Sequence, residues 1–141
     1  MGEQGTPGAI NLDCPVVVQP GECLDEVSGN PRAIDEPTTG EIAITEWLPD
    51  SVLVGDTAGE WLELRAAGSF DLNGLQLGDH NTALTTTVTT VTCLPVNSGD
   101  YVMLAQNLDM MANGGVMNVV AAFPTGIPVH PAPTATDTGR W

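Results

Sequence analysis

The chain has 141 residues, of which 18 are acidic and three are basic, so its formal net charge at neutral pH is −15. The three basic residues are arginines, and there is no lysine. Proteins bind nucleic-acid phosphates through clustered lysine and arginine side chains, so this composition argues against a nucleic-acid reader. It also argues against membrane insertion, since an acidic membrane surface would repel the chain and no apolar run reaches the roughly 18 residues that span a bilayer.

Proline divides the chain into three parts. Residues 1–40 hold five prolines and residues 124–141 hold four, whereas residues 41–123 hold only Pro49 and Pro95. Proline lacks a backbone donor and is rare inside sheets, so the middle part is expected to form the sheets. The first part is predicted to be a mostly irregular N-terminal segment, and the last has the composition of a linker. We expect other domains of a longer parent protein to be its partners.

Six short β-segments are predicted in the middle part, at a spacing of roughly ten residues that is typical of an antiparallel sandwich. In the first segment, Ile42, Ile44 and Leu48 occupy alternate positions, and Glu46 is the odd member of their face. The segments cover residues 41–48, 60–65, 70–77, 85–93, 100–105 and 116–123. The one stretch that leaves room for a helix is residues 104–112, and such a helix would be short.

Alternation also predicts the core of this sandwich. Its members are apolar side chains at every second position of the segments, namely Ile42, Ile44, Leu62, Leu64, Leu72, Leu75, Leu77, Val102 and Leu104. The Asn73-Gly74 pair lies inside the third segment and is interpreted as turn chemistry. A calcium-binding EF-hand loop would need further oxygen ligands and a closing glutamate, and these are absent.

Four sequence blocks, taken in order, resemble those of the lamin tail domain. They are Glu-Ile-Ala-Ile-Thr-Glu from Glu41, Gly-Glu-Trp-Leu-Glu-Leu from Gly59, Phe-Asp-Leu-Asn-Gly-Leu-Gln-Leu-Gly-Asp from Phe70, and Leu-Pro-Val-Asn-Ser-Gly-Asp-Tyr-Val-Met-Leu-Ala from Leu94. The resemblance covers about residues 40–123. It implies an immunoglobulin-like antiparallel β-sandwich, of a family found in nuclear lamins and in secreted or surface proteins of bacteria.

The family usually closes with a further strand, where this chain becomes rich in proline. An open sheet edge is therefore expected, and an open edge is a template for another strand. Residues 127–129 are poorly suited to fill this edge, because proline has no N–H to donate to a neighbouring strand. We expect the β-branched segment at residues 16–18 to pack there instead. A symmetric homodimer through sheet edges is the alternative.

No recognisable catalytic motif is present. His80 and His130 lie far apart in the sequence, which disfavours a shared zinc site, and there is no Gly-x-Ser-x-Gly nucleophile elbow. A carboxylate pair such as Glu46 and Glu63, which glycoside hydrolysis would need, arises by chance among 18 acidic residues. We therefore expect no catalytic residues and no cofactor, and we interpret the chain as not an enzyme.

Calcium is the one metal that this composition leaves open. Asp50, Asp56 and Glu60 surround the loop before the second β-segment, and Asp79 follows the third. Carboxylates are hard oxygen ligands of the kind that Ca²⁺ prefers, so these four residues are the weak candidates for a calcium site. The competing interpretation is a solvated acidic surface without metal.

Three cysteines leave one unpaired within the chain. Cys14 and Cys23 bracket a segment that the Gln-Pro-Gly sequence at residues 19–21 can turn back, which predicts a disulfide between them. Cys93 is interpreted as a small buried hydrophobe. An acidic, lysine-free, threonine-rich chain with proline linkers is typical of an exported bacterial protein.

Composition and resemblance together predict a non-catalytic module of a secreted or cell-surface bacterial protein, with a structural, adhesive or protein-binding role. Two alternatives belong to other classes. One is a calcium-dependent binding module, and the other is an accessory domain of an extracellular hydrolase.

Overall fold

The computed structural model describes residues 16–48, 51–78 and 85–123, and its regular structure is almost entirely β. The strands are β1 (Glu22–Leu24), β2 (Pro31–Ala33), β3 (Ile42–Leu48), β4 (Trp61–Ala66), β5 (Phe70–Asp71), β6 (Gln76–Gly78), β7 (Thr85–Thr87), β8 (Pro95–Val96), β9 (Tyr101–Ala105) and β10 (Val119–Ala122). One helical turn, α1 (Asp56–Gly59), precedes β4. The predicted all-β class is confirmed. Residues 104–112, the one stretch left open for a helix, form none, since β9 runs to Ala105 and turns follow it.

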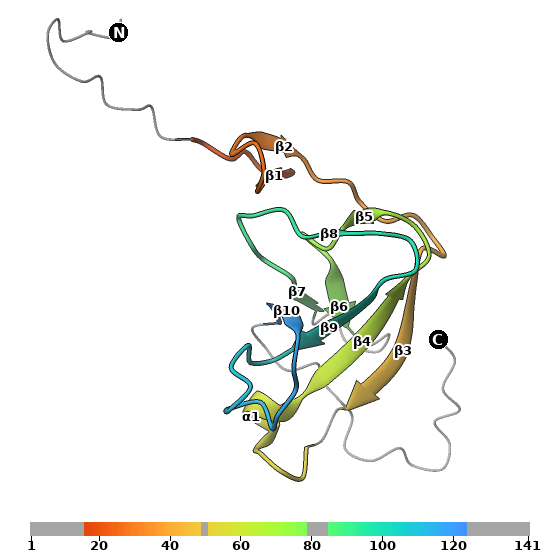
Figure 1. Cartoon of the computed structure of the whole chain (residues 1–141), viewed down its shortest axis with the longest axis vertical. Coiled ribbons are helices and arrows are strands. Elements are labelled where there is room, and N and C mark those ends of the chain that lie inside the picture. The colour runs from red at the N-terminus through yellow and green to blue at the C-terminus, as the bar shows by residue number, and fades with distance from the viewer. Residues whose placement is uncertain (1–15, 49–50, 79–84, 124–141) are drawn as a thin grey trace, which may run out of the picture.

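Four strands form the main sheet, in the order β10-β9-β4-β3, and three two-stranded pairs, β1-β2, β5-β8 and β6-β7, complete the β-structure; β1-β2 and β5-β8 lie toward the upper end of the view in Figure 1. β4 is antiparallel to both of its neighbours, but β10 runs parallel to β9. This differs from the purely antiparallel arrangement expected. The connection over residues 106–118 has the dozen or more residues that a parallel crossover needs, whereas a tight turn would have reversed the strand.

One hydrophobic cluster joins the main sheet to the smaller strand pairs. Six of the predicted core side chains are buried in it, namely Leu62, Leu64, Leu72, Leu77, Val102 and Leu104. Ile42 and Leu75 are partly buried and pack against the cluster. The prediction for Ile44 is wrong, because its side chain is 51% exposed. β3 is an edge strand of the main sheet, so nothing described lies beyond Ile44 to cover it.

A β-bulge at Thr45 explains why Glu46 interrupts the apolar pattern of β3. The pairing of β3 with β4 shifts by one residue between Ile44 and Glu46, and Glu46 then lies opposite Glu63. Residues directly opposite each other on neighbouring strands share a face of the sheet. Glu46 therefore points to the solvent side, and Trp47 takes the next place on the core side and packs against the cluster.

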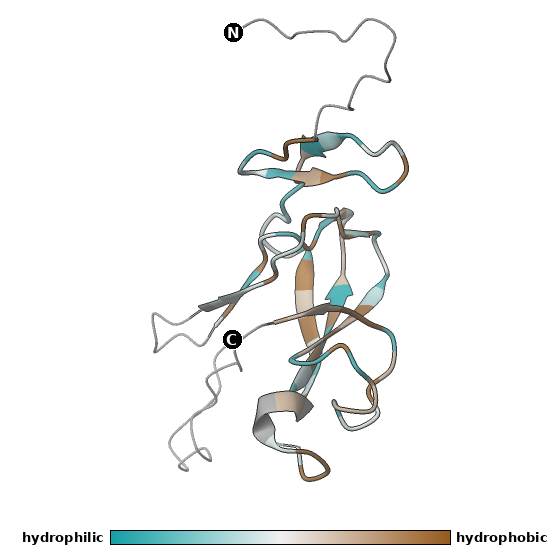
Figure 2. Cartoon of the chain, turned by 90° about the vertical axis from the view of Figure 1, so that its left-hand side faces the viewer, coloured by the Kyte–Doolittle hydropathy of each residue, from teal (hydrophilic) through white to brown (hydrophobic). Residues whose placement is uncertain are grey.

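The N-terminal residues described, from 16 onward, lie against one end of the molecule, and α1 lies at the opposite end (Figure 2). The expected packing of this segment on the β-structure is confirmed, but it is made by β1, which forms a parallel bridge from Leu24 to Thr92. Val16 and Val17 are exposed and belong to no strand, so the prediction that residues 16–18 make this contact is wrong. Residues 127–129 lie outside the described residues. No helix in the described ranges is long and apolar enough to cross a membrane.

Candidate functional site

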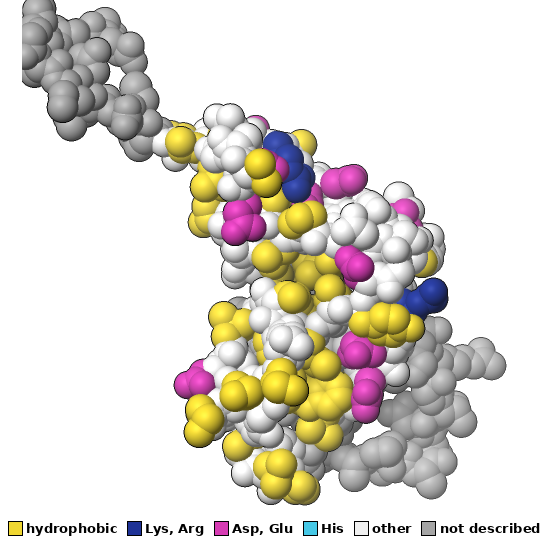
Figure 3. All heavy atoms as spheres, in the orientation of Figure 1, with side chains coloured by type: hydrophobic (Ala, Val, Ile, Leu, Met, Phe, Trp, Pro, Cys, Tyr) yellow, Lys and Arg dark blue, Asp and Glu magenta, His cyan; other side chains and the backbone are white. Residues whose placement is uncertain are grey.

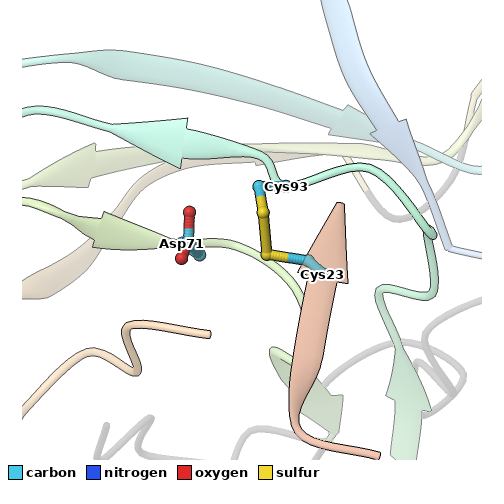
Figure 4. A group of neighbouring side chains, drawn as sticks. All are labelled: Cys23, Asp71 and Cys93. Carbon is cyan, nitrogen blue, oxygen red and sulfur yellow. A yellow bond between two sulfur atoms is a disulfide. The ribbon is translucent and has the colours of Figure 1, made fainter. Parts of the chain in front are cut away.

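Four side chains join the β1-β2 hairpin to the rest of the molecule, and we call them the hairpin clamp: Cys23, Arg32, Asp71 and Cys93. Cys23 of β1 and Arg32 of β2 are directly opposite each other, so both side chains leave the same face of the hairpin. That face is turned toward Asp71, in β5, and Cys93, just before β8. Figure 4 shows Cys23, Cys93 and Asp71 as close neighbours that come from three separate segments.

The first part of the clamp is a disulfide between Cys23 and Cys93, whose Cα atoms are 4.9 Å apart and which are separated by 70 residues in the sequence. Both residues are buried, at 0% and 4% exposure. Backbone hydrogen bonds hold the two segments together at this point. The Leu24 N–H donates to the Val91 carbonyl at 2.7 Å, and the Cys93 N–H donates to the Leu24 carbonyl at 2.9 Å.

The predicted disulfide between Cys14 and Cys23 is therefore wrong, because Cys23 is bonded to Cys93. Cys14 itself lies outside the described residues. The prediction relied on closeness in the sequence, whereas the actual partner is brought near by strand β1 lying beside residues 91–93. The interpretation of Cys93 as buried was correct, but its sulfur is in a disulfide rather than free.

The second part of the clamp is an ion pair between Arg32 and Asp71. Arg32 donates from Nη1 to Asp71 Oδ2 at 2.6 Å and from Nη2 to Asp71 Oδ1 at 2.7 Å, a two-pronged geometry. The backbone N–H of Asp35 donates to Oδ2 at 2.9 Å. These donors, the Arg32 guanidinium first, lower the pKa of Asp71 although burial acts in the opposite direction. The same hydrogen bond raises the pKa of Arg32, so both groups are charged at neutral pH.

Cys23, Asp71 and Cys93 are also the one group in the described ranges whose histidine, cysteine or carboxylate ligand atoms lie close enough together to hold a metal ion. The ligand form of cysteine is the thiolate, and here the two sulfurs are bonded to each other. Both oxygens of Asp71 accept hydrogen bonds from Arg32. In this arrangement the clamp holds the hairpin rather than a metal ion.

Asn73, which lies two residues after Asp71, positions the Cys93 side of the clamp. Its Nδ2 donates to the Thr90 carbonyl at 3.2 Å and the Thr92 carbonyl at 2.9 Å, and its Oδ1 accepts from the Leu94 N–H at 2.7 Å. Gly74 follows with a φ of +78°, the left-handed region that favours glycine. The interpretation of this pair as turn chemistry is confirmed, but the hydrogen bonds to residues 90–94 were not foreseen.

The structure does not gather the calcium candidates into a site. Asp50 and Asp79 lie outside the described residues, and Asp56 begins α1, where only its backbone is described. Glu60 is buried, at 8% exposure, directly before β4.

The histidines and the carboxylate pair can be placed as follows. His80 and His130 lie outside the described residues. Glu46 and Glu63 are directly opposite each other on the solvent side of β3 and β4, and the Thr45 hydroxyl donates to Glu63 Oε1 at 2.6 Å. Like charges in this position repel each other, so the pair weakens the strand contact rather than stabilising it.

A shallow groove of about 360 Å³ lies beside the clamp. Its lining carries no acidic, basic or histidine side chain, and consists of Ile34, Asn73, Gly74, Val88, Thr89, Thr90 and Val91. General acid–base chemistry needs a titratable group within hydrogen-bond reach of the substrate, and this lining offers none.

Comparison with known proteins found no relative: no family model matches the chain, and no curated protein or solved structure matches it significantly.

Proposed function

We propose that this chain is a non-catalytic, lamin-tail-like β-sandwich module of a secreted or cell-surface bacterial protein, with a structural, adhesive or protein-binding role. The observation that carries the proposal is the buried disulfide between Cys23 and Cys93. Disulfides persist in oxidising compartments and are rare in the cytosol, where thiols are kept reduced. The net charge of −15 and the absence of lysine accord with an exported protein.

The use of the buried charged groups supports a structural role. The carboxylate of Asp71 is 1% exposed and accepts two hydrogen bonds from Arg32 and one from the backbone N–H of Asp35, so its known hydrogen bonds all serve to hold the fold together. A catalytic carboxylate would instead face a cleft with its pKa tuned toward the working pH. The lowered pKa of Asp71 is the opposite of what a general acid requires.

The state of the cysteines in the producing cells tests the proposal. Cells are treated with a membrane-impermeant maleimide before lysis. The protein is then denatured and alkylated with a second, heavier maleimide, and mass spectrometry counts the alkylated cysteines. We expect the protein in the secreted or surface fraction with at most one of its three cysteines alkylated. Recovery from the cytosolic fraction with all three cysteines alkylated would overturn the proposal. A Cys93→Ser variant is the matched control, because it frees Cys23 and adds one alkylated position.

A further inference from the structure

The outer edge of β3 is the largest strand edge without a partner among the described residues. β3 is seven residues long, the longest of the described strands, and in the main sheet it pairs only with β4. We propose that this edge binds an extended, basic strand of a partner protein by β-augmentation. The inference rests on the proposed function, since it names the surface through which such a module would bind another protein.

The backbone of β3 presents hydrogen-bonding groups at this edge. The Ala67 N–H donates to the Glu41 carbonyl at 2.7 Å, so the position just before β3 is a hydrogen-bonded pair of the antiparallel ladder. Such pairs alternate with pairs whose N–H and C=O groups point away from each other. The next pair, Ile42 with Ala66, and the pair of Ile44 with Leu64 therefore direct the backbone groups of Ile42 and Ile44 outward.

The hydrophobic core is incomplete at the same place. Ile44 lies directly opposite Leu64 and on the same face of the sheet, yet Leu64 is 2% exposed and Ile44 is 51% exposed. A strand added beside β3 would place an apolar side chain next to Ile44 and cover it. The exposed isoleucine and the outward backbone groups are independent observations, and both indicate that one more strand fits here.

The charged side chains beside the β3 edge indicate which kind of partner strand would bind there. On the solvent side, Glu46 is exposed and lies opposite Glu63, and Arg65, two residues along β4 and opposite Ala43, is the one basic side chain described on this face of the two strands. Figure 3 shows acidic side chains beside hydrophobic ones over β3 and β4. An added strand that alternates apolar residues on the core side with lysine or arginine on the solvent side would cover Ile44 and neutralise the two glutamates.

Two other occupants are less well matched. A second copy of this chain would bring a further net charge of −15 to an edge that already carries Glu46 and Glu63. The chain's own residues 124–141 hold four prolines and one arginine, so the prolines interrupt the row of N–H donors and the segment carries little positive charge. Both remain outcomes of the test below.

The probe is the capped peptide Lys-Val-Lys-Val-Lys-Val-Lys, added to the ¹⁵N-labelled full chain. Two control peptides accompany it: Glu-Val-Glu-Val-Glu-Val-Glu, and the lysine peptide methylated on the nitrogens of two adjacent central residues, which blocks one N–H on each edge. We expect the lysine peptide to slow hydrogen exchange of the Ile42 and Ile44 amides at least tenfold, because these amides gain a partner on binding. Neither control peptide should do so.

The outcomes separate the possible occupants. Equal effects of the acidic and basic peptides, or changes confined to other strands, would overturn the inference. Protection of the Ile42 and Ile44 amides in the free monomer would show that the chain's own segment fills the edge. A dimer in sedimentation velocity whose β3 amides are protected would show that a second copy does.

Variants test the role of charge. Glu46→Gln should weaken binding of the lysine peptide about two- to fivefold, the range of an exposed ion pair. Glu26→Gln, an exposed position in the turn between β1 and β2, should leave the affinity unchanged. If the cysteine experiment succeeds and the peptide does not bind, the proposed module stands and only this inference fails. If the protein proves cytosolic and reduced while the peptide binds as expected, the proposed function fails and the inference about the β3 edge stands.

Discussion

Leu64 and Ile44 show how position in the sheet decides what an apolar residue contributes. The two side chains are directly opposite each other on β4 and β3 and share the core side, but only Leu64 is covered. Burial of apolar surface stabilises in proportion to the area removed from water. Leu64 on the central strand therefore stabilises the fold more than Ile44 does on the edge strand.

This contrast gives a direct test. Leu64→Ala should lower the free energy of unfolding by about 2–5 kcal/mol, the range for truncating a buried leucine. Ile44→Ala is the matched control, and its loss should be less than about half as large, since half of that side chain is already in water. Chemical denaturation of both variants measures the two values. Equal losses would mean that Ile44 is covered in solution.

Asp71 predicts a pH dependence of stability. Its folded pKa is lowered, first by the hydrogen bond from Arg32, from a reference value of 3.8. A carboxyl of lowered pKa stabilises the fold above its unfolded pKa, and that contribution is lost as the pH falls through the folded value. Stability should therefore decline as the pH drops below about 4.

Asp71→Asn should remove this part of the decline and cost more than about 1.5 kcal/mol at pH 7, because hydrogen bonds to a charged group are lost. Denaturant unfolding between pH 2 and pH 7 is the measurement. Glu41→Gln is the control, since Glu41 also has a lowered pKa, by the backbone N–H of Thr38, but is less buried. An unchanged pH profile in Asp71→Asn would contradict the ion pair.

At the scale of elements, Asn73 links the turn after β5 to the segment that leads into β8. It is 4% exposed, and its side-chain amide makes three hydrogen bonds across this gap. Removal of one partner leaves a buried group unsatisfied, which costs about 1–3 kcal/mol for each group. A side chain of this kind therefore fixes the spacing of two chain segments that do not pair as strands at this point.

Asn73→Ala should destabilise the fold by about 2–4 kcal/mol, because the Leu94 N–H and the Thr92 carbonyl lose their partner. Thermal unfolding monitored by circular dichroism is the measurement. Gly74→Ala is the comparison at the next residue. No atom lies within 4 Å of the added Cβ, so its cost should be only the strain of a positive φ, about 1–2 kcal/mol. An effect of Gly74→Ala larger than that of Asn73→Ala would contradict this account.

At the scale of the whole molecule, the disulfide is the single covalent cross-link between the hairpin and the body among the described residues, in addition to the backbone that leads from β2 to β3. It closes a loop of 70 residues. In the chain-entropy account, a bridge across a loop of this length stabilises by about 4 kcal/mol, because it restricts the unfolded chain. The hairpin has only short strands, so without the bridge it would depend on the Arg32–Asp71 pair and a few backbone bonds.

A double variant with Cys23→Ser and Cys93→Ser should therefore lower the free energy of unfolding by about 4 kcal/mol and expose the hairpin to proteolysis near residues 25–30. Denaturation and limited proteolysis under non-reducing conditions measure the two effects. Cys14→Ser is the control and should leave both unchanged. A Cys14→Ser variant destabilised as much as the double variant, together with a Cys93→Ser single variant of unchanged stability, would instead support the pairing of Cys14 with Cys23.

What the sequence by itself determined is the part of the fold that depends on local side-chain pattern. Alternation of apolar residues identified β4 and β9 and placed Leu62, Leu64, Val102 and Leu104 in the core, because side chains of a strand alternate between its two faces whatever lies around it. Turn chemistry at Asn73-Gly74 was predictable for the same reason, since the positive φ is a local requirement.

Only the tertiary structure decided the rest. The pairing of Cys23 with Cys93, the exposure of Ile44 and the parallel direction of β10 each depend on which segments become neighbours, and residues close in sequence carry no record of that. The bulge at Thr45 belongs with them, because one extra residue exchanges the two faces of a strand only relative to a paired neighbour. Contacts between distant segments arise from packing, and the alternation of side chains along one strand does not predict which segments will pack together.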